Sequence, residues 1–235
     1  STFLLPLYLQ NSLGYTAFQA GSLFLPVGLL QAMTAPIAGF LSDKINPKIP
    51  SFCGLVLLAF SLSINGSLSL FSEHHQIMIP LYIRGFAMGM IFTPLTTMAL
   101  SNVPRHKTGQ ASGLYNIIRQ LGGSFGIAFM SSLLTRRTIY HNAIYGQVVN
   151  SQSEIFQNVV RGLTRFSSDA LAGNQALAAM RAQALIASHI ATQSFVKAVG
   201  DVFLTASFIT LAATIPVLFL RYKKKSYGEK PIAID

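Results

Sequence analysis

Residues 39–48 read Gly-Phe-Leu-Ser-Asp-Lys-Ile-Asn-Pro-Lys, a short charged stretch between two long apolar segments. The segments cover residues 22–41 and 49–70. Both reach the roughly 20 residues that a helix needs to cross a bilayer. Membrane-embedded helices seldom share so short a charged turn. We therefore interpret residues 39–48, the hinge loop, as a tight cytoplasmic connection between two membrane-spanning helices.

The composition is typical of a membrane protein. Hydrophobic residues make up 51% of the 235 positions and charged residues only 10%, whereas an average soluble domain has about 25% charged residues. One soluble core could not bury so many long apolar stretches. The expected fold class is an all-α membrane protein, a polytopic helical bundle in contact with the lipid bilayer.

Basic residues are in excess, with 17 Lys and Arg against 7 Asp and Glu and a net charge of +10. In a soluble protein this excess would suggest a nucleic-acid partner. Here the basic residues lie in loops and in the tail, and no basic stripe is interleaved with aromatic residues. We therefore expect no nucleic-acid partner.

Residue patterns that carry enzymatic or metal chemistry are sparse. Cys53 is the single cysteine, so no intrachain disulfide and no site of paired thiols can form. Among the five histidines only His74 and His75 are adjacent, with Glu73 as their one acidic neighbour. Neither a His-Glu-x-x-His pair nor a Gly-x-Ser-x-Gly elbow occurs. We expect no enzyme, no metal and no cofactor.

Five segments are expected to cross the membrane completely, and one only partly. The partial helix is residues 1–9, which we interpret as the cut end of a helix whose amino-terminal partner is missing. The complete spans are expected at residues 22–41, 49–70, 79–103, 113–134 and 201–220. The expected division is residues 1–134 for the first transmembrane helices, 135–200 for an extracytoplasmic helical loop, 201–221 for the last span and 222–235 for a cytoplasmic tail.

The distribution of Lys and Arg over short loops predicts the orientation. The hinge loop, residues 105–107 and residues 221–230 are basic, whereas residues 11–20 and 72–76 carry no Lys or Arg. This predicts a multi-pass protein of the inner cell membrane with a cytoplasmic carboxyl terminus. Residues 135–200 also carry basic side chains, but the loop is too long for the rule to apply. Within it, residues 174–198 are expected to form an amphipathic helix, either a solvated cap or a docking surface.

Charged side chains within spans are costly and usually functional. Two are expected there, Arg84, which could reach to the interface, and Arg119, which shares a polar helical face with Asn116, Gln120 and Gly123. All seven acidic residues lie in loops, at helix ends or in the tail. A carboxylate for proton coupling is therefore expected outside this sequence.

Small residues at four-residue spacing predict close helix packing or sliding surfaces; they are Gly85 with Gly89 and Gly122 with Gly126.

Several stretches resemble the second half of major facilitator superfamily transporters, and most closely the fourteen-helix drug:proton antiporters of the EmrB/QacA type. The resemblance covers nearly the whole chain and is carried by residues 5–11, 14–15, 19–21, 25–26, 39–44, 84–89, 94–97, 109–116, 119–126 and 201–203. It implies the last six of fourteen helices, the first of them truncated. It also implies a mechanism in which two halves rock around a central site.

The resemblance gives Gly39, Asp43 and Lys44 the place of the superfamily's cytoplasmic gating loop. An acid at the carboxyl end of its own helix opposes the helix dipole, so Asp43 should be held by a cation or by a helix amino end. EmrB-like members of double-membrane bacteria work with a periplasmic adaptor and an outer-membrane channel, which are possible partners here.

A cavity for hydrophobic small molecules, either bulky cations or neutral drugs, would be lined by aromatic, flexible and a few polar side chains. The candidates are Phe24, Gln31, Met88, Phe92, Thr96, Asn116, Arg119, Gln120 and Ser124. The leading hypothesis is multidrug efflux driven by the proton gradient. The alternatives are a carrier of a siderophore or metabolite, and a membrane anchor or truncated gene product without transport.

Overall fold

The computed structural model describes residues 3–70, 72–148, 157–158, 161–162 and 175–219. In these ranges the regular structure is entirely helical. The helices are α1 (Leu4–Leu13), α2 (Ala17–Ser22), α3 (Leu25–Lys44), α4 (Lys48–Asn65), α5 (His74–Leu100), the 3-10 helix η1 (Arg105–Lys107), α6 (Thr108–Val148), α8 (Gln175–Ala212) and α9 (Thr214–Phe219). The expected tail, residues 222–235, lies outside the described residues.

The described residues contain five helical segments long and apolar enough to cross a membrane, which confirms the expected fold class. They run over Ala17–Lys44, Lys48–Asn65, His74–Leu100, Thr108–Gln147 and Gln183–Phe219. A sixth helix, α1, has ten residues, about 15 Å at the α-helical rise and therefore half of a span.

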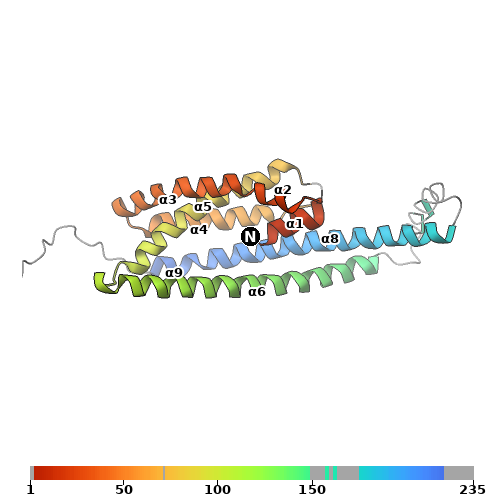
Figure 1. The fold of residues 1–235 in the computed structure, drawn as a ribbon. Coiled ribbons are helices and arrows are strands. Elements are labelled where there is room, and N and C mark those ends of the chain that lie inside the picture. The colour runs from red at the N-terminus through yellow and green to blue at the C-terminus, as the bar shows by residue number, and fades with distance from the viewer. Residues whose placement is uncertain (1–2, 71, 149–156, 159–160, 163–174, 220–235) are drawn as a thin grey trace, which may run out of the picture.

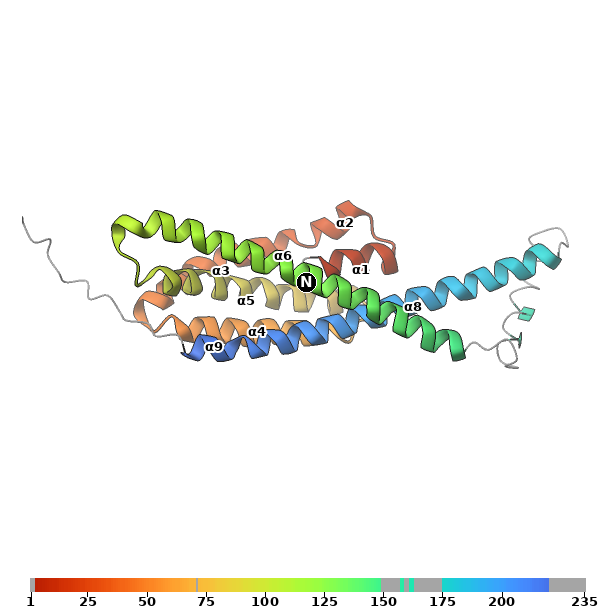
Figure 2. The same cartoon turned by 90° about the horizontal axis from the view of Figure 1, so that it is seen from below.

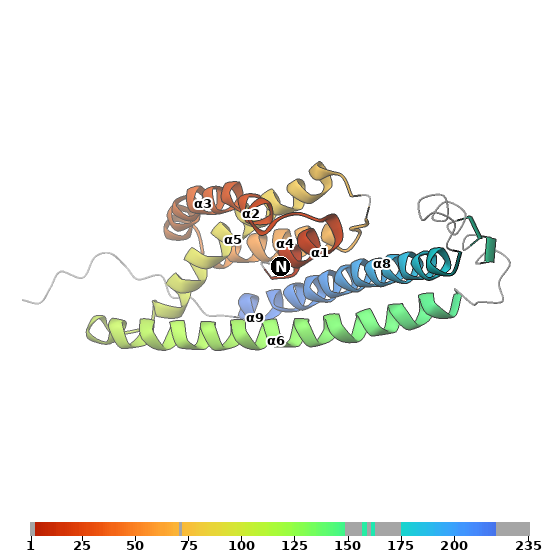
Figure 3. The ribbon, with the colours of Figure 1, turned by 45° about the vertical axis from the view of Figure 1, so that its right-hand side comes forward.

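The helices form two groups (Figures 1 and 3). On one side α5 packs against both α3 and α4. On the other side α6 and α8 lie side by side, and α8 also packs against α4. Seen from below, α6 and α8 diverge at the end where they extend past the other helices (Figure 2). Contact between α6 and α5 is slight, so α8 is the main partner of α6 within the described residues.

Two glycines of α5 bring α3 very close. A Cβ atom built on Gly85 would lie 2.7 Å from the carbonyl oxygen of Val27, and one on Gly89 would lie 2.7 Å from Cβ of Thr34. Real Cβ atoms do not approach other atoms so closely, so a side chain at either position would displace α3. The predicted close packing is confirmed for this glycine pair.

The second glycine pair behaves differently. A Cβ atom on Gly122 or Gly126 would meet no atom within 4 Å among the described residues. Nearly all of α6 from residue 113 to residue 129 is exposed. The expected packing at this pair is therefore absent from the described part of the chain.

A buried apolar cluster holds α1 against α4, α5 and α8 at one end of the bundle. It includes Leu5, Tyr8, Leu81 and Phe203. The Tyr8 hydroxyl donates a 2.6 Å hydrogen bond to the carbonyl oxygen of Ser69, so the one polar atom of this buried ring is satisfied.

The polar loop expected at residues 11–20 is mostly helical. Gly14 ends α1 with φ of 69°, a left-handed conformation that glycine adopts without strain, and its N–H donates to the carbonyl of Leu9. Thr16 then begins α2 through a capping box with Gln19. The loop between the two helices is therefore confined to residues 14–16.

The expected extracytoplasmic loop begins as a continuation of two helices. α6 passes Leu134 without a break and reaches Val148, because no glycine or proline interrupts the sequence between Gly126 and Gly146. The helix expected at residues 174–198 is present as the first part of α8, which continues into the last span. Residues 149–156, 159–160 and 163–174 of this region lie outside the described residues.

Candidate functional site

A cavity of about 470 Å³ opens where α3, α5 and α6 meet, and we call it the α3–α5–α6 cavity. It is lined by Gln31 of α3, by Phe92, Thr93, Thr96 and Thr97 of α5, and by Arg119 of α6. The α5 residues lie one helical turn apart in two pairs, so they form one face of that helix. This face continues the one that carries Gly85 and Gly89, because Gly85, Gly89, Thr93 and Thr97 follow at four-residue spacing.

The threonine side chains make the α5 wall less polar than its sequence suggests. The hydroxyl of Thr96 donates to the carbonyl of Phe92 at 2.8 Å, and that of Thr97 donates to the carbonyl of Thr93 at 3.0 Å. Their hydrogen atoms are therefore used within α5. The Thr96 hydroxyl also lies 3.3 Å from the hydroxyl of Tyr115, and this contact links α5 to α6.

Arg119 is the charged residue of the cavity lining. Its guanidinium carbon lies 5.7 Å from the centre of the Phe92 ring, within the range of a cation–π contact. No ion pair or hydrogen bond holds this guanidinium among the described residues. The cavity therefore combines one aromatic wall, one amide from Gln31 and one cation without a countercharge.

The structure brings together four of the nine predicted cavity residues, namely Gln31, Phe92, Thr96 and Arg119. The other five lie elsewhere: Phe24 stands against Arg84, Met88 lines a different cavity, and Asn116, Gln120 and Ser124 are exposed on α6. Thr93 and Thr97 were missed. The four-residue spacing of Thr93 and Thr97 was the available signal, because it puts both on one face of the helix.

Met88 lines a second, mostly apolar cavity of about 270 Å³ between α1, α4, α5, α6 and α8. Its wall on α6 includes Gly123, Gly126 and Met130. The predicted polar face of α6 is therefore divided, because Arg119 lines the α3–α5–α6 cavity whereas Gly123 lines the mostly apolar cavity.

Arg84 is buried inside the bundle, with 3% of its surface exposed, and does not extend to the surface. Its guanidinium carbon lies 5.1 Å from the centre of the Phe24 ring. Its Nη1 atom is buried without a hydrogen-bond partner among the described residues. Burying a cation without a partner costs free energy, and the contact between Arg84 and the Phe24 ring offsets only part of that cost.

Gly39 and Asp43 of the hinge loop lie at the end of α3. A Cβ atom on Gly39 would lie 3.5 Å from a methyl carbon of Thr93, which is ordinary van der Waals contact. Asp43 is exposed and forms no ion pair within the described residues. The cation expected to hold Asp43 is therefore not supplied by the described part of this chain.

The two lysines of the hinge loop have other contacts. The Nζ atom of Lys44 lies 4.4 Å from the centre of the Phe40 ring, one turn earlier on α3. The Nζ atom of Lys48 donates a 3.2 Å hydrogen bond to the carbonyl oxygen of Leu218. Lys48 therefore joins the start of α4 to the last turn of α9, where the helix dipole favours a cation.

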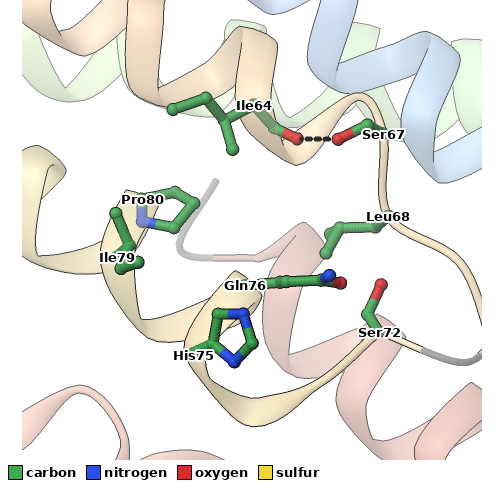
Figure 4. A pocket seen from close by; sticks show the side chains of 8 residues that line it. All are labelled: Ile64, Ser67, Leu68, Ser72, His75, Gln76, Ile79 and Pro80. Atoms are coloured by element: carbon green, nitrogen blue, oxygen red, sulfur yellow. Dashed lines mark hydrogen bonds between the residues drawn. The ribbon is translucent and has the colours of Figure 1, made fainter.

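A third cavity, of about 330 Å³, lies at the turn between α4 and α5 (Figure 4). Its polar side chains are already engaged. The Ser67 hydroxyl donates to the carbonyl of Ile64 at 2.7 Å, as Figure 4 shows. The side-chain oxygens of Ser72 and Gln76 accept backbone N–H bonds from this turn. These contacts shape the turn, and no group of three metal-ligating side chains occurs in the described ranges.

Comparison with known proteins gives a consistent result. The model of the Major Facilitator Superfamily matches residues 1–127. The chain is 29% identical over 227 residues to the uncharacterized MFS-type transporter YhcA of Bacillus subtilis, covering 95% of this chain and 42% of that protein. It is 27% identical to the multidrug export protein EmrB of Haemophilus influenzae, covering 94% of this chain and 42% of that protein.

A further relative is the fatty acid resistance protein FarB of Neisseria gonorrhoeae, 27% identical over 217 residues, with 92% of this chain and 41% of that protein covered. The chain therefore spans less than half the length of these relatives. The helical bundle, the five apolar spans and the matched residues agree with the resemblance to the EmrB-type drug:proton antiporters. The chain belongs to the major facilitator superfamily, a family of membrane transport proteins and not of enzymes.

Proposed function

We propose that the complete protein exports hydrophobic compounds by alternating access, driven by the proton gradient, from the inner cell membrane. The single observation that carries this proposal is the α3–α5–α6 cavity, in which an aromatic ring, an amide and a free cation meet between three membrane helices. Its volume of about 470 Å³ lies within the range of small-molecule sites. Three relatives have names that include multidrug export or resistance.

The cavity charge favours neutral or anionic substrates over cations. Arg119 lines the cavity, and no Asp or Glu among the described residues does. In a membrane a cationic drug would have to approach this guanidinium at close range, where repulsion is poorly screened. A carboxylate or phenolate would instead pair with it, while Phe92 contacts the apolar part. FarB, a relative named for fatty acid resistance, is consistent with acidic amphiphiles as substrates.

Alternating access requires a second half that rocks against this one. In our proposal the missing amino-terminal half completes the cavity beside the exposed length of α6. Asp43 then pairs with a cation of that half in one transport state and separates from it in the other, which makes Gly39, Asp43 and Lys44 the cytoplasmic gate. The carboxyl terminus is cytoplasmic, and the extension of α6 and α8 faces outward, toward a periplasmic adaptor and an outer-membrane channel where the cell has them.

The test is resistance profiling of the complete protein in a host that lacks its own efflux pumps. The panel contains hydrophobic compounds of matched size that are anionic, neutral or cationic. The complete protein should raise tolerance to anionic and neutral members. Arg119→Ala should lower tolerance to the anionic members by about tenfold, because a charge-assisted contact contributes about 1.5 kcal/mol or more.

The matched control is Arg136→Ala, an exposed arginine on the same helix outside the cavity. It should leave every tolerance unchanged. Unchanged tolerance across the whole panel, with the complete protein verified in the membrane, would refute drug export. If Arg119→Ala lowers tolerance to anionic and to neutral compounds equally, the charge preference is refuted but drug export is not.

A carrier of an anionic metabolite or siderophore remains the second candidate, and the free charge of Arg119 is the observation that favours it. The direction of transport separates the two functions. Accumulation of a labelled organic anion inside cells that express the protein would support uptake, whereas faster loss from preloaded cells would support export.

A further inference from the structure

We propose that His141, Asp201 and Arg137 form a proton-binding site that ties α6 to α8 where both helices leave the rest of the bundle. Asp201 lies sixty residues after His141 in the sequence, and neither motif nor composition connects the two. Nothing in the proposed transport function assigns them a role. Asp201 lies within α8 and has a titratable partner, whereas the expectation that the carboxylate for proton coupling lies outside this sequence stays a prediction.

The geometry is a three-membered cluster around one carboxylate oxygen. Nε2 of His141 lies 2.8 Å from Oδ2 of Asp201, and Nη1 of Arg137 lies 3.7 Å from the same oxygen. Arg137 and His141 are one turn apart on α6, so both face α8. Gly200, next to Asp201, packs against Gly66 at the end of α4. The cluster therefore lies beside that end of α4.

The site is sheltered and still open to water. The exposed fraction of the side chain is 17% for His141, 31% for Asp201 and 47% for Arg137. The His141 ring is stacked on Tyr145, with centroids 6.1 Å apart, and meets Tyr140 edge-on at 5.5 Å. The imidazole is therefore held in place, and the remaining exposure leaves a path for a proton.

The contact with Asp201 determines which ring nitrogen takes up the proton. An ionised carboxylate accepts a hydrogen bond, so it favours the neutral tautomer with hydrogen on Nε2. Nδ1 then carries the free lone pair, and it has no hydrogen-bond partner among the described residues. A proton from water binds Nδ1, the Nε2–H bond to Asp201 persists, and the charge of the cluster rises from zero to +1.

The other ionisable groups on the described lengths of α1, α4, α6, α8 and α9 do not offset this added charge. Lys197, one turn before Asp201 on α8, and Arg136 on α6 are exposed cations. Asp201 is the sole carboxylate on the described lengths of α6 and α8. On α1, the Tyr8 hydroxyl donates to Ser69. On α4, Lys48 and Cys53 lie toward the end of the helix that is far from Gly66. α9 has no ionisable side chain.

Protonation makes two cations compete for one carboxylate oxygen. His141 has the shorter and less exposed contact, so the longer contact of the half-exposed Arg137 is the one that breaks. Arg137 then moves toward water, and the junction between α6 and α8 relaxes. Because α6 also carries Arg119 into the α3–α5–α6 cavity, a change at this junction can reach the cavity through one continuous helix.

The experiment measures the separation of α6 and α8 in the complete protein, reconstituted in nanodiscs, as a function of pH. Spin labels replace the exposed residues Ile144 and Leu185 in a Cys53→Ser background. The distance distribution, recorded in a pH series from about 5 to 8, should shift in one step. His189→Gln, an exposed histidine of α8, is the matched control and should show the same shift.

His141→Gln should abolish the shift, because glutamine keeps a donor for Asp201 and binds no proton. Asp201→Asn should also reduce the shift, because the carboxylate oxygen for which Arg137 and His141 compete is lost. A shift that persists in His141→Gln, or a distance that does not change with pH in the unmutated protein, would overturn the proposal. The measurement needs no transport, so a protein that exports nothing but shows the His141-dependent shift would refute the proposed function and leave the proton site standing.

Discussion

The glycine pairs of α5 and α6 have the same spacing and opposite surroundings. Gly85 and Gly89 lie so close to α3 that a single added carbon would clash, whereas Gly122 and Gly126 meet nothing within 4 Å among the described residues. The sequence pattern permits close approach, but a partner helix must also be present. α3 and α4 both pack against α5, while α8 is the main partner of α6 among the described residues (Figure 3).

The difference extends to the apolar side chains of the two regions. α5 buries ten residues along its length, and this accounts for its central place in the bundle. On α6 large apolar side chains such as Leu114, Ile118, Leu121 and Phe125 are exposed. In a bilayer such a face is covered by lipid or by another helix at similar cost. Mutations at the two glycine pairs can therefore tell a packed helix face from a free one.

The largest effect is expected for Gly85→Ala in the complete protein. The added methyl group would lie 2.7 Å from the Val27 carbonyl oxygen, so α3 must move, and the free energy of unfolding should fall by about 1–3 kcal/mol. Unfolding in mixed detergent micelles measures the change. Gly28→Ala, at an open position of α3, is the control and should not be destabilising. Equal stability of both variants would mean that α3 and α5 are less closely packed than described.

A similar but more local loss is expected for Gly200→Ala. Its Cβ atom would lie 2.7 Å from the carbonyl oxygen of Gly66, at the contact between α4 and α8. The same unfolding measurement should give a loss of about 1–2 kcal/mol, because the end of α4 can shift more easily than a packed span. Spin labels on α4 and α8 should report a wider separation, and an unchanged separation would argue against this close contact.

A smaller effect is expected at the hydroxyl contact between α5 and α6. Tyr115→Phe removes the hydroxyl that lies 3.3 Å from Oγ1 of Thr96. Hydrogen bonds between membrane helices contribute about 0.6 kcal/mol on average, and the loss should be of that size. Thr96→Val combined with Tyr115→Phe should cost no more than Thr96→Val alone, because Thr96→Val already removes this contact together with the bond to the Phe92 carbonyl. Additive losses would show that the two hydroxyls act independently.

The smallest effect is expected for Gly126→Ala. The contacts of the described residues predict a change within about 0.5 kcal/mol, because an added methyl group meets nothing there. The complete protein provides the sharpest comparison with Gly85→Ala. A loss as large as that of Gly85→Ala would reveal a helix from the rest of the protein packed against α6. A change near zero would instead mean that this face of α6 contacts lipid or an open cavity.

The candidate site was predictable only in part. Gln31, Phe92, Thr96 and Arg119 were identified as aromatic, polar or charged side chains within apolar segments, and they do meet in one cavity. Asn116, Gln120 and Ser124 were assigned to the same site because they share a helical face or lie near one. A helical face can be read from sequence spacing, but its rotation relative to neighbouring helices is set by packing.

The sequence by itself determined the class of protein and the number of spans. A run of about 20 apolar residues in lipid must satisfy its own backbone hydrogen bonds, and a helix is the way a single segment can do so. That constraint is local, so composition and segment length reveal it. The family motifs are equally local, and they were also recognisable from the sequence.

Only the tertiary structure decided which surfaces meet. It buried Arg84 against Phe24, packed α3 against one glycine pair and left the other open. It also placed His141 beside Asp201, sixty residues later in the chain. Such pairs depend on how whole helices are rotated and offset against one another. Many small contacts along each helix fix that arrangement together, and no single stretch of sequence contains them.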